Sequence, residues 1–476
     1  MKKKLLILCL VLVFILFFIF QIIRLNWWAR TENPVLDWDQ SWHLMISINK
    51  YNDLTNYKHN TSSVEEIYPI FKFANNYYPP FFHIMTLPFY FVFGTGYSSA
   101  LLTNSFFLLV LAVSSFFIGK KIKDEKTGLL FAFISMTIPI YNKMILQYLI
   151  DYAFVAMVAL GYMFYLYSDN FNHKTYSMLF GLVFGLGMLT KWSYPVYFGI
   201  LILFSLGKLD KTKIINLSLA SLIVLIIIFS WYFPRLATLP QQLSVYAGNQ
   251  EGYPLFNTLP SLTYYLKEII NGFSLVYFLL FILCLFYAHK TKNEIYNIFF
   301  IYAIFTLLTI KVSRYIMPIC IFMTAILVEG LSNLSVKFKQ TKFNRYKIDN
   351  LIVGFILLAG FFSLSFPEKI NSSIDVNKIL SSIEDQNYTV CIIAESDELN
   401  DVNTPYYAMK NNYPVKYMIG NGCNPLAFDY AIVGPIETSW RSNNFKYSEI
   451  TLINNLDKFE TINIIHNITI YKKKLN

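Results

Sequence analysis

Long apolar runs are the feature of this sequence that most restricts its fold. Eleven of them approach the roughly 17–25 residues that an α-helix needs to cross a bilayer. Charged residues make up only 14% of the chain, whereas soluble proteins carry about 25%. Most of the chain is therefore expected to face lipid or the interior of a helical bundle. The expected spans are residues 5–24, 98–118, 128–147, 149–167, 176–191, 193–207, 214–233, 272–288, 296–312, 314–331 and 350–366.

Basic residues between these spans indicate the side of the membrane on which each connection lies. The net charge of +10 comes from short Lys and Arg runs between apolar segments, which is the positive-inside pattern and not a surface for nucleic acid. Every second connection is rich in these residues, so these connections are expected in the cytoplasm and the alternate ones outside. Cytoplasmic and external connections alternate in this way if the short run 81–95 lies in the membrane interface or forms a re-entrant segment. If this run crosses the membrane, another of the expected spans must be reassigned. The basic connections are Lys120–Lys126, Asp169–Lys174, Lys208–Lys213, His289–Lys292 and Lys337–Lys347.

Composition divides the chain into two expected domains. Residues 1–366 form an α-helical polytopic membrane domain of about eleven to twelve spans. Its long external loops are 25–80, which carries interfacial helices, and 234–271, which is expected to help select a substrate. Residues 367–476 form a small extracytoplasmic α/β domain, in which short β-rich runs alternate with polar stretches. These runs are Thr389–Ala394, Val415–Ile419, Tyr430–Val433 and Ile462–Tyr471.

The expected C-terminal domain carries little chemistry of its own. Cys391 and Cys423 can pair if the domain lies outside the cytoplasm. The sequence there contains no phosphate-binding glycine loop, no Cys/His cluster with metal-ligand spacing and no catalytic triad. The domain is therefore interpreted as a cap that supports the membrane domain or shapes the acceptor site.

An acidic cluster follows the first span, where Asp37, Asp39 and His43 lie within seven residues and two Trp separate them. A carboxylate of this kind can take the proton of an acceptor hydroxyl or amine as it attacks an anomeric carbon. If a helix begins at Asp39, this residue and His43 lie on one face at positions i and i+4. The alternative is that Asp37 or Asp39 only caps an interfacial helix.

Three further ionisable groups lie at the expected outer ends of spans: Asp151, Lys191, and Arg314 followed by Tyr315. Each has a structural alternative, namely a helix cap for the aspartate, a lysine that extends to the interface, and an interfacial arginine. Charges at membrane depth are costly and mark candidate functional sites. Together they place carboxylates and cations on one face of the membrane. Glycosyl transfer from a phosphate-linked lipid requires this arrangement, because cations stabilise the departing phosphate.

The order of these motifs resembles the GT-C membrane glycosyltransferases of the protein O-mannosyltransferase and lipid A aminoarabinose transferase type, glycosyltransferase family 39. The similarity covers about residues 1–366. The Asp-Glu pair of the family is here Asp39-Gln40, so a mechanism that uses both carboxylates is not carried over to this chain. Either Asp37 or His43 compensates for the missing second carboxylate, or the reaction needs only one. The other matching elements are Tyr77-Tyr78-Pro79-Pro80-Phe81-Phe82-His83 through Phe93-Gly94, Ile150-Asp151, Gly187 with Thr190-Lys191, and Arg314-Tyr315-Ile316-Met317-Pro318.

The resemblance implies an inverting transfer of a monosaccharide from a polyprenyl-phosphate donor to an envelope glycan, lipid or protein. It implies that Asp39 is the leading catalytic carboxylate, and it leaves a divalent cation open because members of this fold differ in metal use. The residues that it places at the reaction centre are Asp39, Asp37, Gln40 and His43. Those at the donor phosphate are Lys191, Arg314 and Tyr315, and those at the substrates are Asp151, Tyr78 and His83. No metal ligands are predicted.

The expected location is a plasma membrane, with the active site outside the cytoplasm; the Lys-, Asn- and Ile-rich composition is typical of an AT-rich bacterial genome. The expected partners are a polyprenyl-phosphate-linked sugar, membrane lipid and the envelope acceptor, and no nucleic acid. A transporter or flippase of a lipid-linked substrate is the alternative from another class. It would place ionisable residues near the bilayer midplane and broken helices in paired positions, whereas the charges here gather at the outer interface. A related enzyme that transfers a whole oligosaccharide is not distinguished.

Overall fold

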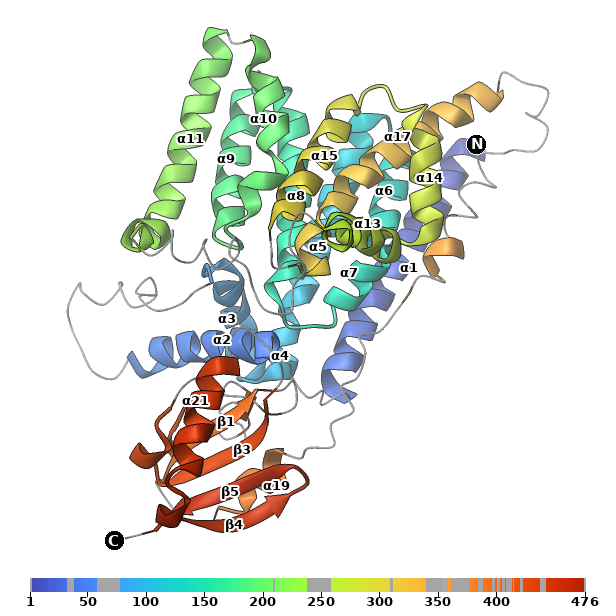
Figure 1. The fold of residues 1–476 in the computed structure, drawn as a ribbon. Helices are drawn as coiled ribbons and strands as arrows, with labels where there is room; N and C mark the ends of the chain where they lie inside the picture. The colour runs from blue at the N-terminus through green and yellow to red at the C-terminus, as the bar shows by residue number, and fades with distance from the viewer. Residues whose placement is uncertain are drawn as a thin grey trace. The chain divides into compact units, whose positions relative to one another are not determined.

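A computed structural model describes most of the chain, which divides into two compact units (Figure 1). The helical unit comprises Met1–Thr31, Lys50–Gly248 and Pro254–Pro367. The sheet unit comprises Glu32–Asn49, Asn249–Tyr253 and Glu368–Asn476. The described residues are 2–31, 38–57, 78–208, 210–237, 258–308, 311–339, 354, 356, 358–361, 364, 376–383, 388–395, 399, 403–404, 407, 413, 415–419, 423–436 and 442–474.

Helices account for nearly all of the described helical unit. Helix α2 (Trp38–Tyr57) begins in the sheet unit and ends in the helical unit. The others are α1 (Lys2–Thr31), α3 (Phe81–Phe93), α4 (Tyr97–Leu101), α5 (Thr103–Ile122), α6 (Glu125–Thr137), α7 (Pro139–Met144), α8 (Ile150–Ser168), α9 (Lys174–Met188), η2 (Tyr194–Tyr197), α10 (Gly199–Ser205), η3 (Leu206–Lys208), α11 (Lys211–Tyr232), η4 (Phe233–Arg235), α13 (Leu259–Phe273), α14 (Leu275–Leu285), α15 (Lys292–Leu307), α16 (Ser313–Ile316) and α17 (Ile319–Lys339).

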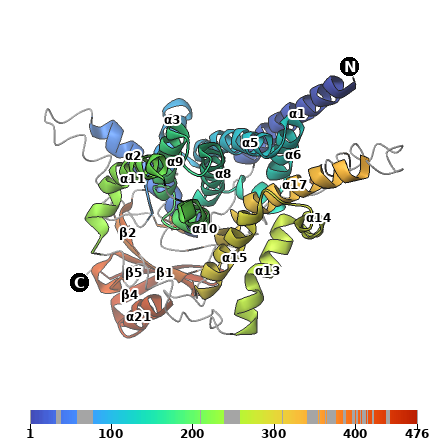
Figure 2. The ribbon, with the colours of Figure 1, turned by 90° about the horizontal axis from the view of Figure 1, so that it is seen from above.

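Helix α8 forms the centre of this unit. It is apolar on all sides, and most of its side chains are buried, as expected of a helix surrounded by other helices. It packs between α5 and α9, which lie on either side of it when the bundle is seen from above (Figure 2). On the far side of α9, Gly181 brings the backbone of α11 close, because an added Cβ would lie 2.5 Å from the carbonyl oxygen of Ala220.

Several basic connections lie together at one end of the bundle (Figure 1). The ammonium of Lys123 donates to the carbonyl of Ser332 at 2.9 Å, and that of Lys290 donates to the carbonyl of Ile122 at 3.2 Å. These bonds join the α5–α6 turn to α17 and to the α14–α15 turn. Asp124 caps α6 by accepting from the amide of Thr127 at 2.9 Å. Two of the five connections predicted on one side by charge, Lys120–Lys126 and His289–Lys292, are thus neighbours in space.

Five helices in the described part of the chain are long and apolar enough to cross a membrane, and one further pair would do so if its bend is included: Val11–Arg30, Tyr97–Ile122, Ile150–Ser168, Lys211–Arg235, Ile319–Lys337, and the bent pair Leu259–Phe273 with Leu275–Leu285. The run expected at 81–95 forms α3, which has 13 residues. At 1.5 Å per residue it is about 20 Å long, short of the roughly 30 Å hydrocarbon core. This length favours the interfacial or re-entrant placement.

Two expected spans are broken by proline. The run 128–147 ends as α6 at Thr137, and α7 begins at Pro139. Ile138 is extended, with ψ of 123°, which is the conformation preferred before a proline. The run 314–331 is likewise divided into α16 and α17, and Pro318 lies between them. A continuous helix was the wrong prediction at both places.

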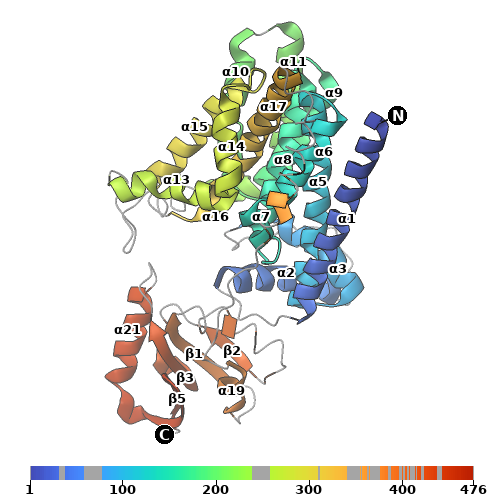
Figure 3. The same cartoon turned by 90° about the vertical axis from the view of Figure 1, so that its right-hand side faces the viewer.

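The second half of the expected external loop 234–271 contains a helix that was not predicted, α13. This helix meets α14 at an angle of 106°, so it lies across the direction of α14 (Figure 3). Its apolar residues recur at helical spacing on one face: Tyr265 and Ile269 are buried, and Leu259, Leu262 and Leu266 beside them are exposed.

The sheet unit contains a five-stranded sheet of order β2-β1-β3-β5-β4. Strands β1 (Tyr388–Glu395), β2 (Val415–Ile419) and β3 (Tyr430–Ile436) are parallel, and β4 (Phe459–Ile465) and β5 (Ile468–Lys473) complete it as an antiparallel hairpin. The single expected strand at 462–471 is therefore two strands. The turn between them includes His466, whose φ is +54°. Helices α19 (Val376–Ser381) and α21 (Ser442–Ile453), with the turns η6 (Pro425–Ala427) and η7 (Leu456–Lys458), complete the described elements.

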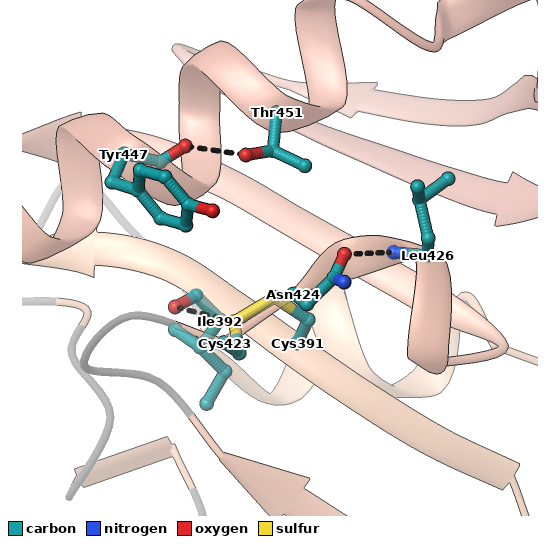
Figure 4. Close-up of a disulfide and its surroundings, with 7 residues drawn as sticks. All are labelled: Cys391, Ile392, Cys423, Asn424, Leu426, Tyr447 and Thr451. Atoms are coloured by element: carbon teal, nitrogen blue, oxygen red, sulfur yellow. Dashed lines mark hydrogen bonds between the residues drawn. A yellow bond between two sulfur atoms is a disulfide. The ribbon is translucent and has the colours of Figure 1, made fainter.

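A disulfide joins Cys391 of β1 to Cys423 (Figure 4). It lies on the face of the sheet that also carries Ile393 and Ala431 and packs against Leu452 of α21. The opposite face carries the alternate residues of β1, as the two-residue period of a strand requires. The pairing suggested by the sequence is confirmed.

Candidate functional site

A buried carboxylate is the centre of the candidate site. Asp151 is the second residue of α8 and is only 3% exposed. Its Oδ1 lies 2.7 Å from the ammonium of Lys191, and its Oδ2 lies 3.4 Å from Nε of Arg314. The helix begins after Leu149, so Asp151 is not its N-cap. One carboxylate therefore joins two cations that come from distant parts of the chain.

Lys191 lies three residues after the end of α9, in the short connection to η2. Its amide donates to the carbonyl of Gly187 at 2.9 Å, which turns the chain at this point. The ammonium lies 4.3 Å from the centre of the Tyr315 ring and 5.7 Å from that of Phe154. The side chain is 11% exposed. The alternative of a lysine that extends away from the protein is therefore wrong.

Arg314 and Tyr315 lie in the four-residue helix α16. The arginine is directed to Asp151 and the tyrosine ring covers Lys191, so consecutive residues contact both ends of the ion pair. The preceding basic residue, Lys311, has a different role. Its ammonium donates to the carbonyls of Thr306 and Leu308 at 2.8 and 2.7 Å and so caps the end of α15.

Helix α3 packs close to these residues through its backbone and its rings. The amide of Phe81 donates to the carbonyl of Leu189 at 2.9 Å, two residues before Lys191. Phe82 packs on Tyr148 with ring centres 4.9 Å apart. Of the expected substrate residues nearby, Tyr78 is half-buried and precedes the helix, whereas His83 is fully buried within it.

The acidic cluster lies on α2 where the structure describes it. Asp39 is in the first turn and is half-buried, whereas Gln40 and His43 are buried. Asp39 and His43 are at positions i and i+4 of one helix, as predicted. Asp37 lies outside the described residues. Because α2 up to Asn49 belongs to the sheet unit, the approach of Asp39 to Asp151 stays a prediction.

The helical unit also holds buried cations that the motifs did not mark, among them Arg235 and Lys50. Arg235, at the end of η4, donates to the carbonyl of Trp231 at 2.7 Å and lies over its ring. Lys50 is 7% exposed. Burial lowers the pKa of Lys50 to about 7, with Asp53 opposing and Arg235 reinforcing the change. Neither belongs to a motif of the family, so only the fold brings them to notice.

Two buried tyrosines were also missed. Tyr197 and Tyr141 donate their hydroxyls to the backbone of α16 and of the residue that follows it. Aromatic residues are 18% of this chain, so the sequence gives no signal that distinguishes these two from the other tyrosines. Among the described residues, no group of three or more His, Cys, Asp or Glu side chains is arranged to hold a metal ion.

Comparison with known proteins identifies the fold through structure and not through sequence. The sequence matches no protein-family model, and no curated protein resembles it at a significant level. Solved structures do resemble it, and they are GT-C glycosyltransferases. The protein is an α-helical polytopic membrane protein with the GT-C fold and a small C-terminal domain built on a sheet. The predicted fold class is therefore confirmed.

Within that class, the structure is similar to ArnT from Cupriavidus metallidurans in the apo state. The TM-score is 0.62 at 12% identity, over 96% of this chain and 97% of that chain. The form of the same protein bound to undecaprenyl phosphate gives a TM-score of 0.60. The apo oligosaccharyltransferase of Archaeoglobus fulgidus gives 0.56 at 11% identity, over 91% of this chain and 70% of that chain.

Proposed function

We propose that this protein is a membrane glycosyltransferase, which moves a monosaccharide from a polyprenyl-phosphate donor to an envelope glycan, lipid or protein with inversion at the anomeric carbon. The observation that carries this proposal is the joining of Lys191 and Arg314 by Asp151. The fold similarity to ArnT, solved with undecaprenyl phosphate, supports a donor of the same chemistry.

The cations serve the departing phosphate. In the proposed reaction the bond between the anomeric carbon and the phosphate oxygen breaks, and the polyprenyl phosphate leaves with the electron pair. An ammonium has three N–H donors and a guanidinium five, so Lys191 and Arg314 can contact both Asp151 and a phosphate. Arginine matches phosphate geometry with two parallel bonds. Charge stabilisation of this kind is often the largest single contribution to catalysis.

Asp39 serves the acceptor. Its carboxylate accepts the proton of the attacking hydroxyl or amine while the new glycosidic bond forms. Gln40 and His43 orient this carboxylate and the acceptor, and Asp37 lies close to Asp39 in the sequence. The residues that contact the substrates are Tyr78, His83 and Asp151. A single displacement on the face opposite to the phosphate inverts the anomeric carbon.

The site is assigned to the extracytoplasmic side of a bacterial plasma membrane. Basic connections gather at one end of the bundle, which the positive-inside rule assigns to the cytoplasm. The disulfide between Cys391 and Cys423 supports an oxidising environment for the C-terminal domain.

The test compares Asp39→Asn with Asp53→Asn, an exposed aspartate on the same helix. Proteoliposomes that contain each variant receive labelled polyprenyl-phosphate sugars and an envelope acceptor fraction, and mass spectrometry detects the new glycosidic bond. Loss of a general base predicts at least about a hundredfold fall in turnover for Asp39→Asn, with little change for the control. Wild-type turnover in Asp39→Asn contradicts the assignment of the base. Movement of the lipid-linked sugar without a new bond supports a transporter instead.

A further inference from the structure

The position of Arg314 depends on groups outside its own helix. Helix α16 has four residues, Ser313–Ile316, which is too short for a helix to be stable by itself. Met317 and Pro318 follow it, and the proline lacks the amide that would extend its hydrogen bonding. Bonds from neighbouring elements must therefore fix the backbone that carries Arg314 and Tyr315.

Tyr197 supplies the first of these bonds. It is the last residue of η2 and is fully buried, and its hydroxyl donates to the carbonyl of Tyr315. Its own carbonyl accepts from the side-chain amide of Asn297 on α15 at 2.8 Å. Its ring packs edge-on against Phe154 of α8, with ring centres 5.3 Å apart. Helices α15 and α8 thus hold Tyr197 in place, and its hydroxyl forms a hydrogen bond to the backbone of α16.

Tyr141 supplies the second bond. It lies in α7, is 1% exposed, and donates its hydroxyl to the carbonyl of Met317 at 2.9 Å. The next residue, Asn142, accepts from the guanidinium of Arg24 on α1, at its side-chain oxygen and at its carbonyl. Helix α7 is therefore bound to α1 at the point where it contacts α16.

We propose that Tyr197 and Tyr141 are positioning residues for the donor-phosphate site, which act by fixing the α16 backbone so that Arg314 faces Asp151 and the Tyr315 ring covers Lys191. The two hydroxyls bind carbonyls on either side of Ile316, so they restrict both the rotation and the shift of this short helix. Neither tyrosine touches the ion pair through its hydroxyl. The proposal rests on the proposed function, because it takes Lys191 and Arg314 as phosphate ligands.

Tyr194 provides a matched control. It belongs to the same helix η2, it is also fully buried, and its hydroxyl also donates to a backbone carbonyl, that of Met157 at 2.8 Å. Met157 lies within α8, whose backbone is already fixed by helical hydrogen bonds. Tyr194→Phe and Tyr197→Phe therefore remove the same chemical group from the same helix, and only the second releases α16.

The experiment measures the binding of undecaprenyl phosphate to purified full-length protein in nanodiscs, together with the thermal midpoint. Tyr197→Phe is expected to weaken binding about five- to tenfold, which is the ratio that one buried hydrogen bond supplies. Tyr194→Phe is expected to leave binding unchanged, even where it lowers the midpoint equally. In the Arg314→Gln background, Tyr197→Phe is expected to have a smaller effect on binding, because part of its effect acts through Arg314.

Equal binding by Tyr197→Phe and Tyr194→Phe, or an undiminished effect of Tyr197→Phe in the Arg314→Gln background, overturns this inference alone. If the wild-type protein does not bind undecaprenyl phosphate, the proposed function fails and the inference fails with it. Where Tyr197→Phe does not accumulate in the membrane, Tyr141→Phe undergoes the same comparison, with the same expected loss of binding and the same dependence on Arg314.

Discussion

Replacing Asp151 by Asn keeps the shape of the side chain and removes the charge that joins two cations. The carboxylate is 4% exposed, and its oxygens lie 2.7 Å from Lys191 Nζ and 3.4 Å from Arg314 Nε. In Asp151→Asn the two cations stay in place without their shared counter-charge. Removing one partner of a buried ion pair costs about 3–5 kcal/mol, because the remaining charge is left uncompensated. At roughly 2 °C per kcal/mol for a large domain, the thermal midpoint is expected to fall by about 6–10 °C.

The assay is scanning fluorimetry of the purified protein at one heating rate, because membrane proteins often unfold irreversibly. Asp169→Asn is the control, since Asp169 is an exposed residue at the opposite end of α8. The double variant Asp151→Asn with Lys191→Met should recover part of the loss, because it removes one of the uncompensated cations. A midpoint within about 1 °C of wild type for Asp151→Asn, or no recovery in the double variant, would refute the reasoning.

Three further changes test other parts of the structure. Gly187→Ala places a Cβ 2.3 Å from a ring carbon of Tyr194. The turn before Lys191 must then shift, and turnover should fall at least about tenfold. Gly207→Ala is the control and should keep wild-type turnover, because its Cβ meets no atom within 4 Å. Cys423→Ser opens a disulfide of sequence separation 32, which should cost about 3–4 kcal/mol of stability of the C-terminal domain, measured by denaturant unfolding of the purified protein. Cys391 is buried, so its freed thiol should react with an impermeant maleimide only as this domain unfolds. The pKa of Lys50 is lowered from 10.5 to about 7. Its positive charge therefore destabilises the folded state below pH 7, and this destabilisation decreases as the pH rises toward 10.5. Lys50→Met should raise the thermal midpoint more at about pH 6 than at about pH 9.

The sequence predicted the membrane class, and it marked Asp151, Lys191 and Arg314, which the structure brings together. Both follow from patterns that can be recognised without a structure. Apolar length and basic connections are properties of the chain itself. The order of Asp151, Lys191 and Arg314 along alternate connections was enough to place them at one end of a bundle. Their contact distances could not be predicted, because they depend on how α8, η2 and α16 pack.

The missed features share a physical reason. A broken helix and a continuous one have the same apolar composition. The breaks at Pro139 and Pro318 lie within apolar runs, so the length of these runs did not reveal them. Helix α13 within the external loop 234–271 was not predicted because only one of its faces is apolar. The hairpin at His466 reads as one β-rich run because its turn is only two residues long.

The geometry of Asp151 also bears on which residue acts as the base. Both of its oxygens are engaged, one with the ammonium of Lys191 and the other with the guanidinium of Arg314. To accept a proton from an attacking hydroxyl, Asp151 would have to give up one of these ion pairs as the phosphate departs. The cations it positions would then be least well placed at the moment when negative charge on the phosphate is greatest. A carboxylate that organises the donor site is therefore a poor choice for the base. In the proposed reaction the proton therefore goes to another group, and Asp39 in the first turn of α2 is the carboxylate that the sequence offers for this role.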